Sequence, residues 1–321
     1  MPRTSTFEWL SLLAALLVFA ATPGLAQDFP SRPLRLVAAN SPGSAVDLIA
    51  RIMGPEMSRS LGQPVVVENR AGAASIIGYE YVAKAPPDGY TSVIANRLEL
   101  ATLPLIAKDL RFDPHKDLAP IIGLSEGRLV VATSSTMPWK KFIELRDNAR
   151  ANPGKLNSGG SSVVVRLISE QVFREAGIKL AFIPYSSTGA YAQALLTGDL
   201  HVGITSESVA AAMGDKIRML AITGAQRLET LRDVPTFAEL GHPSIGGVSH
   251  GINVPLRTPR AAIEKLQAAA SRALQQPEVK AQFAKIRQDI VEQSADIAAK
   301  NLDDEIRIFA EVAKSTNMQL Q

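Results

Sequence analysis

The sequence predicts an α/β fold divided into two lobes. Short runs of valine, isoleucine and leucine alternate with longer segments that carry apolar residues at helical spacing, which is typical of open, mostly parallel sheets. The succession of strand, small-residue turn and helix occurs twice, at residues 34–51 and 156–173. Ligands of such sheets bind beyond the carboxyl ends of the strands, where these turns lie. We therefore expect a hinged pair of domains with a ligand between them.

The first 26 residues are typical of a signal peptide. Arg3 provides a positive start, residues 9–21 form an apolar core, and small residues at 24–26 precede Gln27. The apolar run is shorter than a membrane span requires. We expect export with cleavage after Ala26. Roughly 295 of the 321 residues then remain, a length that favours two domains.

The composition excludes several classes of site and partner. The chain contains no cysteine, so disulfides, thiolate metal sites, a cysteine nucleophile and a lipidated cysteine are excluded. The four histidines stand far apart and no dinucleotide-binding glycine motif is present, so we expect no metal and no other cofactor. The net charge of +3 is small and dispersed, which argues against nucleic acid as a partner.

The predicted strands follow one another along the chain as short apolar runs. They are residues 34–39, 65–68, 91–95, 129–133, 180–183, 201–205 and 217–223. From about Pro259 to the end the sequence lacks such runs. Ile263, Leu266 and Ala270 share one helix face there, so this last part is predicted to be helical.

The first turn, residues 42–45, lies between a buried strand and a helix in which Val46 and Ile49 begin an apolar stripe. Its small residues let a backbone approach closely, and the unpaired amides at a helix start favour an anion. Two interpretations stay open. The turn binds an anion, or it is an ordinary loop in which Asp47 stabilises the first turn of the helix.

The second turn has the sequence Asn-Ser-Gly-Gly-Ser-Ser at residues 157–162, at the expected start of another helix. It offers backbone amides and hydroxyl groups to a ligand. Simple helix capping uses the same residue types, so this turn alone does not decide between capping and anion binding. The presence of two such turns in one chain favours anion binding.

A Gly-x-Ser-x-Gly pattern at residues 123–127 makes an exported serine hydrolase using Ser125 a rival hypothesis. That motif requires a strand, a sharp turn and a helix, whereas here one strand-like run follows another. The pattern therefore argues against an active Ser125. Ester turnover that is lost in Ser125→Ala would contradict a binding role.

Five segments spread over the chain carry a family resemblance. They are residues 61–73, 82–91, 111–121, 152–157 and 232–241. In this order they resemble the Bug family, the TctC-like extracytoplasmic solute receptors of tripartite tricarboxylate transporters. The resemblance implies a type II-like periplasmic-binding-protein (Venus flytrap) fold, a small organic carboxylate as ligand, no enzymatic activity, and the permease subunits of such a transporter as partners.

In relatives a Pro-Gly-Gly-x-x-Asp turn and a Ser-Ser-Gly-x-Gly-Ser turn grip the ligand, and they match residues 42–47 and 158–163 here. The chain departs from the pattern at several places, including Ser44 for a glycine and Arg166 for a usual histidine. The candidate ligand-binding residues are Asn40, Ser44, Ala45, Val46, Asn96, Arg97, Ser158, Gly160, Ser162, Val163, Tyr185, Thr188 and Ser206.

Arg97 follows a strand whose end should face the cleft. It would either bind a carboxylate through two parallel hydrogen bonds or pair with Glu99.

The resemblance and the order of elements together place the lobes. Lobe 1 should contain residues 27–125 and 252–321, and lobe 2 residues 126–251, with two chain crossings as the hinge. We expect a monomer in the periplasm that closes on its ligand and docks on the permease. A sensory adaptor that reports the same ligand to a membrane kinase remains an alternative.

Overall fold

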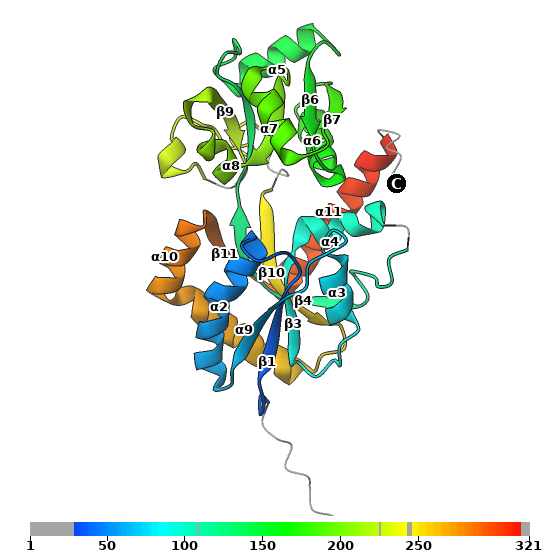
Figure 1. Cartoon of the computed structure of the whole chain (residues 1–321), viewed down its shortest axis with the longest axis vertical. Helices are drawn as coiled ribbons and strands as arrows, with labels where there is room; N and C mark the ends of the chain where they lie inside the picture. The colour runs from blue at the N-terminus through cyan, green and yellow to red at the C-terminus, as the bar shows by residue number, and fades with distance from the viewer. Residues whose placement is uncertain (1–28, 108, 225, 243–245, 316–321) are drawn as a thin grey trace, which may run out of the picture.

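The structure is a computed structural model that describes residues 29–107, 109–224, 226–242 and 246–315. The predicted signal peptide, residues 1–26, lies outside the described residues. The molecule is elongated, with two lobes stacked along its long axis and one β-sheet in each (Figure 1). The predicted two-lobed α/β fold is therefore confirmed.

The lower lobe in Figure 1 contains a six-stranded sheet in the order β11-β4-β10-β3-β1-β2. Its strands are β1 (Leu34–Ala38), β2 (Val65–Asn69), β3 (Thr91–Asn96), β4 (Leu118–Gly127), β10 (Val248–Pro255) and β11 (Gln288–Ser294). Its helices are α2 (Ala45–Leu61), α3 (Ile76–Ala83), α4 (Arg97–Ile106), α9 (Arg260–Gln275), α10 (Pro277–Lys285) and α11 (Ala295–Ser315). Strands β1, β2 and β3 are parallel, whereas β10 runs antiparallel to β3 and β4.

The upper lobe contains a five-stranded sheet in the order β7-β6-β8-β5-β9. Its strands are β5 (Leu129–Ser134), β6 (Asn157–Gly160), β7 (Ala181–Pro184), β8 (Val202–Ser206) and β9 (Ile217–Ile222). Its helices are α5 (Phe142–Ala151), α6 (Val163–Glu175), α7 (Thr188–Thr197) and α8 (Glu207–Ala212), with short 3₁₀ turns η1 (Gly214–Lys216) and η2 (Glu229–Leu231).

Helices cover both faces of each sheet, because apolar side chains project from both faces and have to be buried. In the lower lobe α2, α9 and α10 pack on one face and α3, α4 and α11 on the other. The predicted stripe of α2 is buried, with Val46 2 % exposed and Ile49 fully enclosed. Strands sandwiched in this way are apolar on both sides, which is why their sequences are continuous apolar runs.

Four of the eleven strands in the described residues lie outside the predicted list, namely β4, β6, β10 and β11. β4 covers the first of the two strand-like runs noted around Ser125. β6 corrects the expectation of a turn over residues 157–162, because residues 157–160 pair with β7 and β8 as a strand.

β11 corrects the expectation for the C-terminal part. β11 interrupts the helices expected after Pro259, because the polar sequence Gln-Asp-Ile-Val-Glu-Gln-Ser forms an edge strand on β4. An edge strand is held by backbone pairing and needs no apolar run. β10 was also missed, since His250, Gly251 and Asn253 break its apolar pattern.

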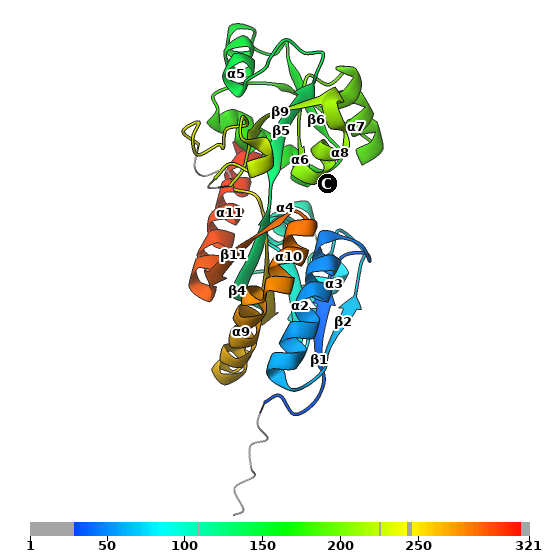
Figure 2. The same cartoon turned by 90° about the vertical axis from the view of Figure 1, so that its left-hand side faces the viewer.

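The chain crosses between the sheets at two places, after β4 and before β10. Figure 2 shows β4 rising from the lower lobe toward the upper one. The predicted lobe boundaries at 125/126 and 251/252 fall inside β4 and β10, which pair with each other from Gly127 opposite Val248 to Leu118 opposite Pro255. We propose that the hinge lies just beyond these strand ends.

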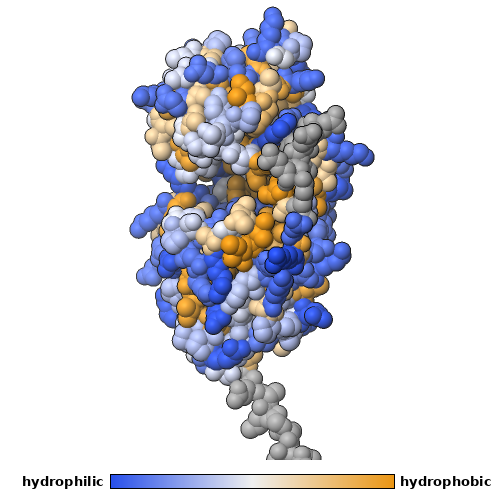
Figure 3. Space-filling view, turned by 45° about the vertical axis from the view of Figure 1, so that its right-hand side comes forward, coloured by the Kyte–Doolittle hydropathy of each residue, from blue (hydrophilic) through white to orange (hydrophobic). Residues whose placement is uncertain are grey.

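The lobes also contact each other beside the crossings. On one side α6 packs against α4 and α11, and the apolar cluster runs continuously from Leu167 in the upper lobe to Phe309 in α11. On the other side Arg287 pairs with Glu207 of α8, and Arg128 pairs with Asp289 of β11. Figure 3 shows the waist between the lobes, with apolar residues gathered beside it.

Candidate functional site

Strand directions place the helix starts of the two lobes toward each other. β10 begins at the crossing, so its antiparallel partner β3 ends there, with Asn96 opposite His250. β1 runs parallel to β3 and ends on the same side. In the upper lobe β5 begins at the crossing opposite Ser206, the last residue of β8, and β6 and β7 run in the same direction as β8. The carboxyl ends of all five strands therefore face the other lobe.

Each of these five strands leads into a helix whose N-cap is a serine or an asparagine. In every case the side-chain oxygen accepts a hydrogen bond from the amide three residues later. The caps are Ser44 for α2, Asn96 for α4, Ser162 for α6, Ser187 for α7 and Ser206 for α8. Five positive helix ends are thus directed at the space between the lobes.

In the first turn Asp47 holds the backbone in place. Its carboxylate accepts hydrogen bonds from the Gly43 amide at 2.9 Å, from Arg51 Nε at 2.9 Å and from Asn69 Nδ2 at 2.8 Å. Burial opposes ionisation of this carboxyl, but these hydrogen bonds and the charge of Arg51 lower its pKa. The amides of Ala45 and Val46 have no hydrogen-bond partner among the described residues. Asp47 thus stabilises the turn and leaves two donors open to an anion.

A hydrogen-bonded network beside this turn contains residues that the sequence did not single out. Glu99 accepts from Asn40 Nδ2 at 3.1 Å and from the Tyr79 hydroxyl at 2.9 Å. The Tyr79 hydroxyl accepts from the Asn96 amide at 3.0 Å, and Ser75 Oγ donates to Asn40 Oδ1 at 2.9 Å. The network joins the loops after β1, β2 and β3. It fixes the side chains of Asn40 and Asn96, two candidate ligand-binding residues.

Burial raises the pKa of Glu99, against the hydrogen bonds that favour its charged form. Asn96 and Glu99 occupy the N-cap and the third helical position of α4. In a capping box the glutamate would accept from the N-cap amide directly. Here the Tyr79 hydroxyl lies between the two groups. The spacing Asn-x-x-Glu was a signal that would have marked Glu99 as part of the network.

Arg97 does not pair with Glu99, which corrects that expectation. Its Nε and Nη2 donate to Oε1 of Glu305 on α11 at 2.8 and 2.7 Å, and both side chains are largely buried. No local pattern could indicate a partner 208 residues away. A ligand contact by Arg97 stays a prediction. The charge of its guanidinium is already balanced by Glu305.

In the upper lobe the second turn is tightly packed. Gly160 ends β6, and a Cβ there would lie 2.4 Å from Val165 Cγ1, so a larger residue would displace the start of α6. Tyr185 donates its amide to the Gly160 carbonyl at 2.9 Å. The amides of Val163 and Val164 have no partner among the described residues, as at the start of α2.

The remaining candidates of this lobe are dispersed over three strand ends. Ser158 is buried in β6, Thr188 begins α7 with its hydroxyl 3.3 Å from Ser161 Oγ, and Ser206 caps α8. The fold brings together the turn at 158–163, Tyr185 and Thr188. Ligand contact by any of them remains a prediction.

We predict that Tyr79→Phe destabilises the protein by about 1–3 kcal/mol, because the buried Asn96 amide and the Glu99 carboxyl each lose a hydrogen-bond partner. Urea denaturation measures the effect. Tyr81→Phe on the same helix is the matched control, since the Tyr81 hydroxyl accepts from the exposed Arg35. Equal stability losses in the two variants would contradict the role given to Tyr79.

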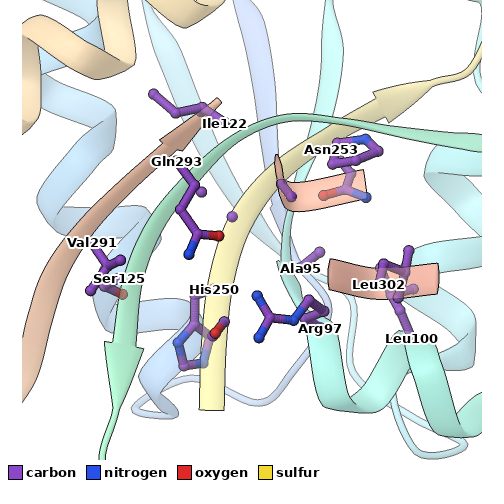
Figure 4. Close-up of a pocket in the computed structure, with 15 residues that line it drawn as sticks. Ala95, Arg97, Leu100, Ile122, Ser125, His250, Asn253, Val291, Gln293 and Leu302 are labelled. Carbon is purple, nitrogen blue, oxygen red and sulfur yellow. The ribbon is translucent and has the colours of Figure 1, made fainter. Parts of the chain in front are cut away.

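A small cavity lies inside the lower lobe, between β4, β10, β11 and the start of α4. Arg97, His250 and Gln293 point into it, and Leu100 and Leu302 lie at its side (Figure 4). Its volume is about 30 Å³, enough for one or two water molecules. It is much smaller than a small-molecule binding pocket.

This cavity bears on the hydrolase hypothesis, because Ser125 and His250 are direct neighbours across β4 and β10. Ser125 is 2 % exposed, and its hydroxyl donates to Gln288 Oε1 at 3.2 Å. Burial, with a smaller effect of Arg97, lowers the pKa of His250 to about 4 against a hydrogen bond with Gln288. Among the described residues the Ser125 hydroxyl therefore donates to an amide oxygen and not to a base, and the burial of Ser125 closes it to a substrate.

The buried His250 predicts acid sensitivity. Its pKa is depressed in the folded state, so its contribution to stability is present above about pH 6.5 and is lost as the pH falls toward 4. Between pH 7 and pH 4 the wild type should lose about 3 kcal/mol more unfolding free energy than His250→Gln. Denaturation curves across this range test it, with His242→Gln as control. Parallel pH profiles for wild type and His250→Gln would show that the histidine is not responsible.

The described residues contain no group of three or more histidine, aspartate or glutamate side chains placed to hold a metal ion. Within the same residues, no helix has the length and apolar character needed to cross a bilayer.

Two α/β lobes with capped helix starts on both sides of a double crossing define a two-lobed binding protein. A family model described as the tripartite tricarboxylate transporter family receptor matches residues 49–318. The chain therefore belongs to this receptor family, and the resemblance drawn from the motifs is confirmed. Protein BugT of Bordetella pertussis is 30% identical over 325 residues, which cover 97% of this chain and 98% of BugT.

Solved structures agree with this assignment. MatC from Rhodopseudomonas palustris, with bound malate, is 26% identical with a TM-score of 0.68, over 88% of this chain and 99% of MatC. Another R. palustris protein, solved with adipate, is 27% identical with a TM-score of 0.70, over 90% of this chain and 99% of that one. This chain is thus a solute-binding receptor of the TctC type.

Proposed function

We propose that this chain is a periplasmic receptor, exported by a signal peptide cleaved after Ala26, that binds a small organic carboxylate between its lobes. It acts as a monomer and delivers the ligand to the membrane subunits of a tripartite tricarboxylate transporter. The observation that carries the proposal is the set of five helix starts that face each other across the waist. Malate and adipate in the related structures support a carboxylate as ligand.

The ligand would be held chiefly by backbone amides. The free donors of Ala45 and Val46 in α2 and of Val163 and Val164 in α6 lie at positive helix ends. Such donors stabilise a carboxylate without a full counter-charge in the site. A ligand that touches both turns binds the closed form better than the open one and shifts the lobes toward closure.

The first test is a thermal-shift screen of the purified protein. Mono-, di- and tricarboxylates and amino acids are compared, each at a high concentration. A true ligand at a hundred times its dissociation constant should raise the stability by about 2.7 kcal/mol, because it binds only the native state. Stabilisation by none of these compounds, all of which carry a carboxylate, would contradict the proposal.

The second test removes single amide donors. Proline is well tolerated at the first helical position, and Ser44 has φ −69° and ψ 161°, which suit the residue before a proline. Ala45→Pro should therefore keep the fold while weakening binding about ten- to a hundredfold, the value of a hydrogen bond to a charged group. Val163→Pro should behave alike, since Ser162 is also extended.

Calorimetric titration of the wild type and of both proline variants with the ligand found in the screen gives their affinities. Arg260→Pro is the matched control, because Arg260 is the exposed first residue of α9, which follows the opposite end of the sheet. It should bind like the wild type. Undiminished affinity in both Ala45→Pro and Val163→Pro, with normal melting of the free proteins, would rule out the amides as donors.

A further inference from the structure

Arg166 carries a charge that forms no ion pair among the described residues. It lies on the first turn of α6, its Nε is buried without a hydrogen-bond partner, and no described residue forms an ion pair with its guanidinium. Its charge acts on the pKa of Glu170, one helical turn away, without a hydrogen bond between the two side chains. A buried donor without a partner is unfavourable, so a ligand group that accepts from it would relieve that cost.

Four other arginines of the chain differ from it in this respect. Arg97 pairs with Glu305 and Arg51 with Asp47 in the lower lobe. Arg287 pairs with Glu207 at the start of α8, and Arg128 pairs with Asp289. Each of these guanidinium groups already has a carboxylate partner, and Arg166 does not.

The position of Arg166 is close to the second turn. Its Cζ lies 5.3 Å from the centre of the Phe182 ring. A Cβ on Gly160 would lie 3.4 Å from the same ring. The guanidinium and the turn at 158–163 therefore share one aromatic neighbour. Helix α6 is also the upper-lobe helix that packs against α4 and α11 of the lower lobe.

We propose that Arg166 binds a second anionic group of the ligand from the upper lobe, and so sets the preference for ligands with two carboxylates over those with one. This inference rests on the proposed function and assigns a residue within the same site. One carboxylate would lie on the free amides of α2 and α6. The other would accept two parallel hydrogen bonds from the planar guanidinium, a geometry that lysine cannot reproduce.

Adipate and hexanoate form a matched pair of probes, because they have the same chain length and differ by one carboxylate. Calorimetric titration should show that the wild type prefers adipate. In Arg166→Gln adipate binding should weaken about ten- to a hundredfold while hexanoate binding changes less than threefold, so that the preference collapses. Arg166→Lys should keep part of the preference, since it retains the charge without the fork.

Two further variants make the result specific. Arg174→Gln, in the last turn of the same helix and exposed, should bind both probes like the wild type. Glu170→Gln should bind adipate about two- to fivefold more tightly, because a competing carboxylate is removed from the neighbourhood of Arg166. The gain in Glu170→Gln tests the proposal even where Arg166→Gln folds poorly.

The possible results distinguish a failure of the role given to Arg166 from a failure of the proposed function. A wild type that prefers adipate, together with an Arg166→Gln variant that keeps the full preference, overturns the inference and leaves the proposed function standing. The same holds if the preference is lost only in Arg97→Gln. A wild type that binds no carboxylate overturns the proposed function, and this inference with it.

Discussion

The antiparallel pairing of β10 with both β3 and β4 is the constraint on which the arrangement of the site depends. β4 ends at one crossing between the lobes and β10 begins at the other, so their pairing fixes the direction of every neighbouring strand. β1 and β3 must then end toward the upper lobe, and the pairing of β5 with β8 fixes the opposite ends in the same way. Five helix starts meet at the waist as a consequence of topology, before any side chain is considered.

Three carboxylates near the helix starts are already paired with arginines. Asp47 is held by Arg51, Glu305 by Arg97 and Glu207 by Arg287. Arg97 and Glu305 are both largely buried, so leaving either one alone is costly and this pair is a poor candidate for exchange with a ligand. The free helix amides can bind a carboxylate instead. They offer a partial positive charge, and its burial avoids the desolvation cost of a full cation.

The network around Glu99 gives the lower half of the site its rigidity. Asn40 and Tyr79, which come from the loop after β1 and from α3, both donate to the Glu99 carboxyl group. Ser75 and Asn96 join the network through Asn40 and Tyr79. A network in which every member has a partner holds side chains in one arrangement. The open amides of α2 lie beside it on a backbone already fixed by Asp47. A receptor built in this way recognises its ligand with little rearrangement inside each lobe and moves chiefly at the crossings.

The sequence by itself determined the α/β class, most of the buried strands, the turn before α2 and the family, because each of these follows from local residue patterns. Apolar runs and helical spacing reveal elements that are buried on a periodic face, as in β1 and α2. The polar edge strand β11 and the irregular β10 escaped, since backbone pairing stabilises them independently of an apolar pattern.

Only the tertiary structure decided which charges are available to a ligand. Arg97 looked like the cation of the site, and it is paired with a glutamate far along the chain. Arg166 forms no ion pair with any described residue, and its buried Nε has no hydrogen-bond partner there. The physical reason is distance in sequence. Local periodicity records the neighbours of a residue along its own element, while ion pairs join elements that folding alone brings together.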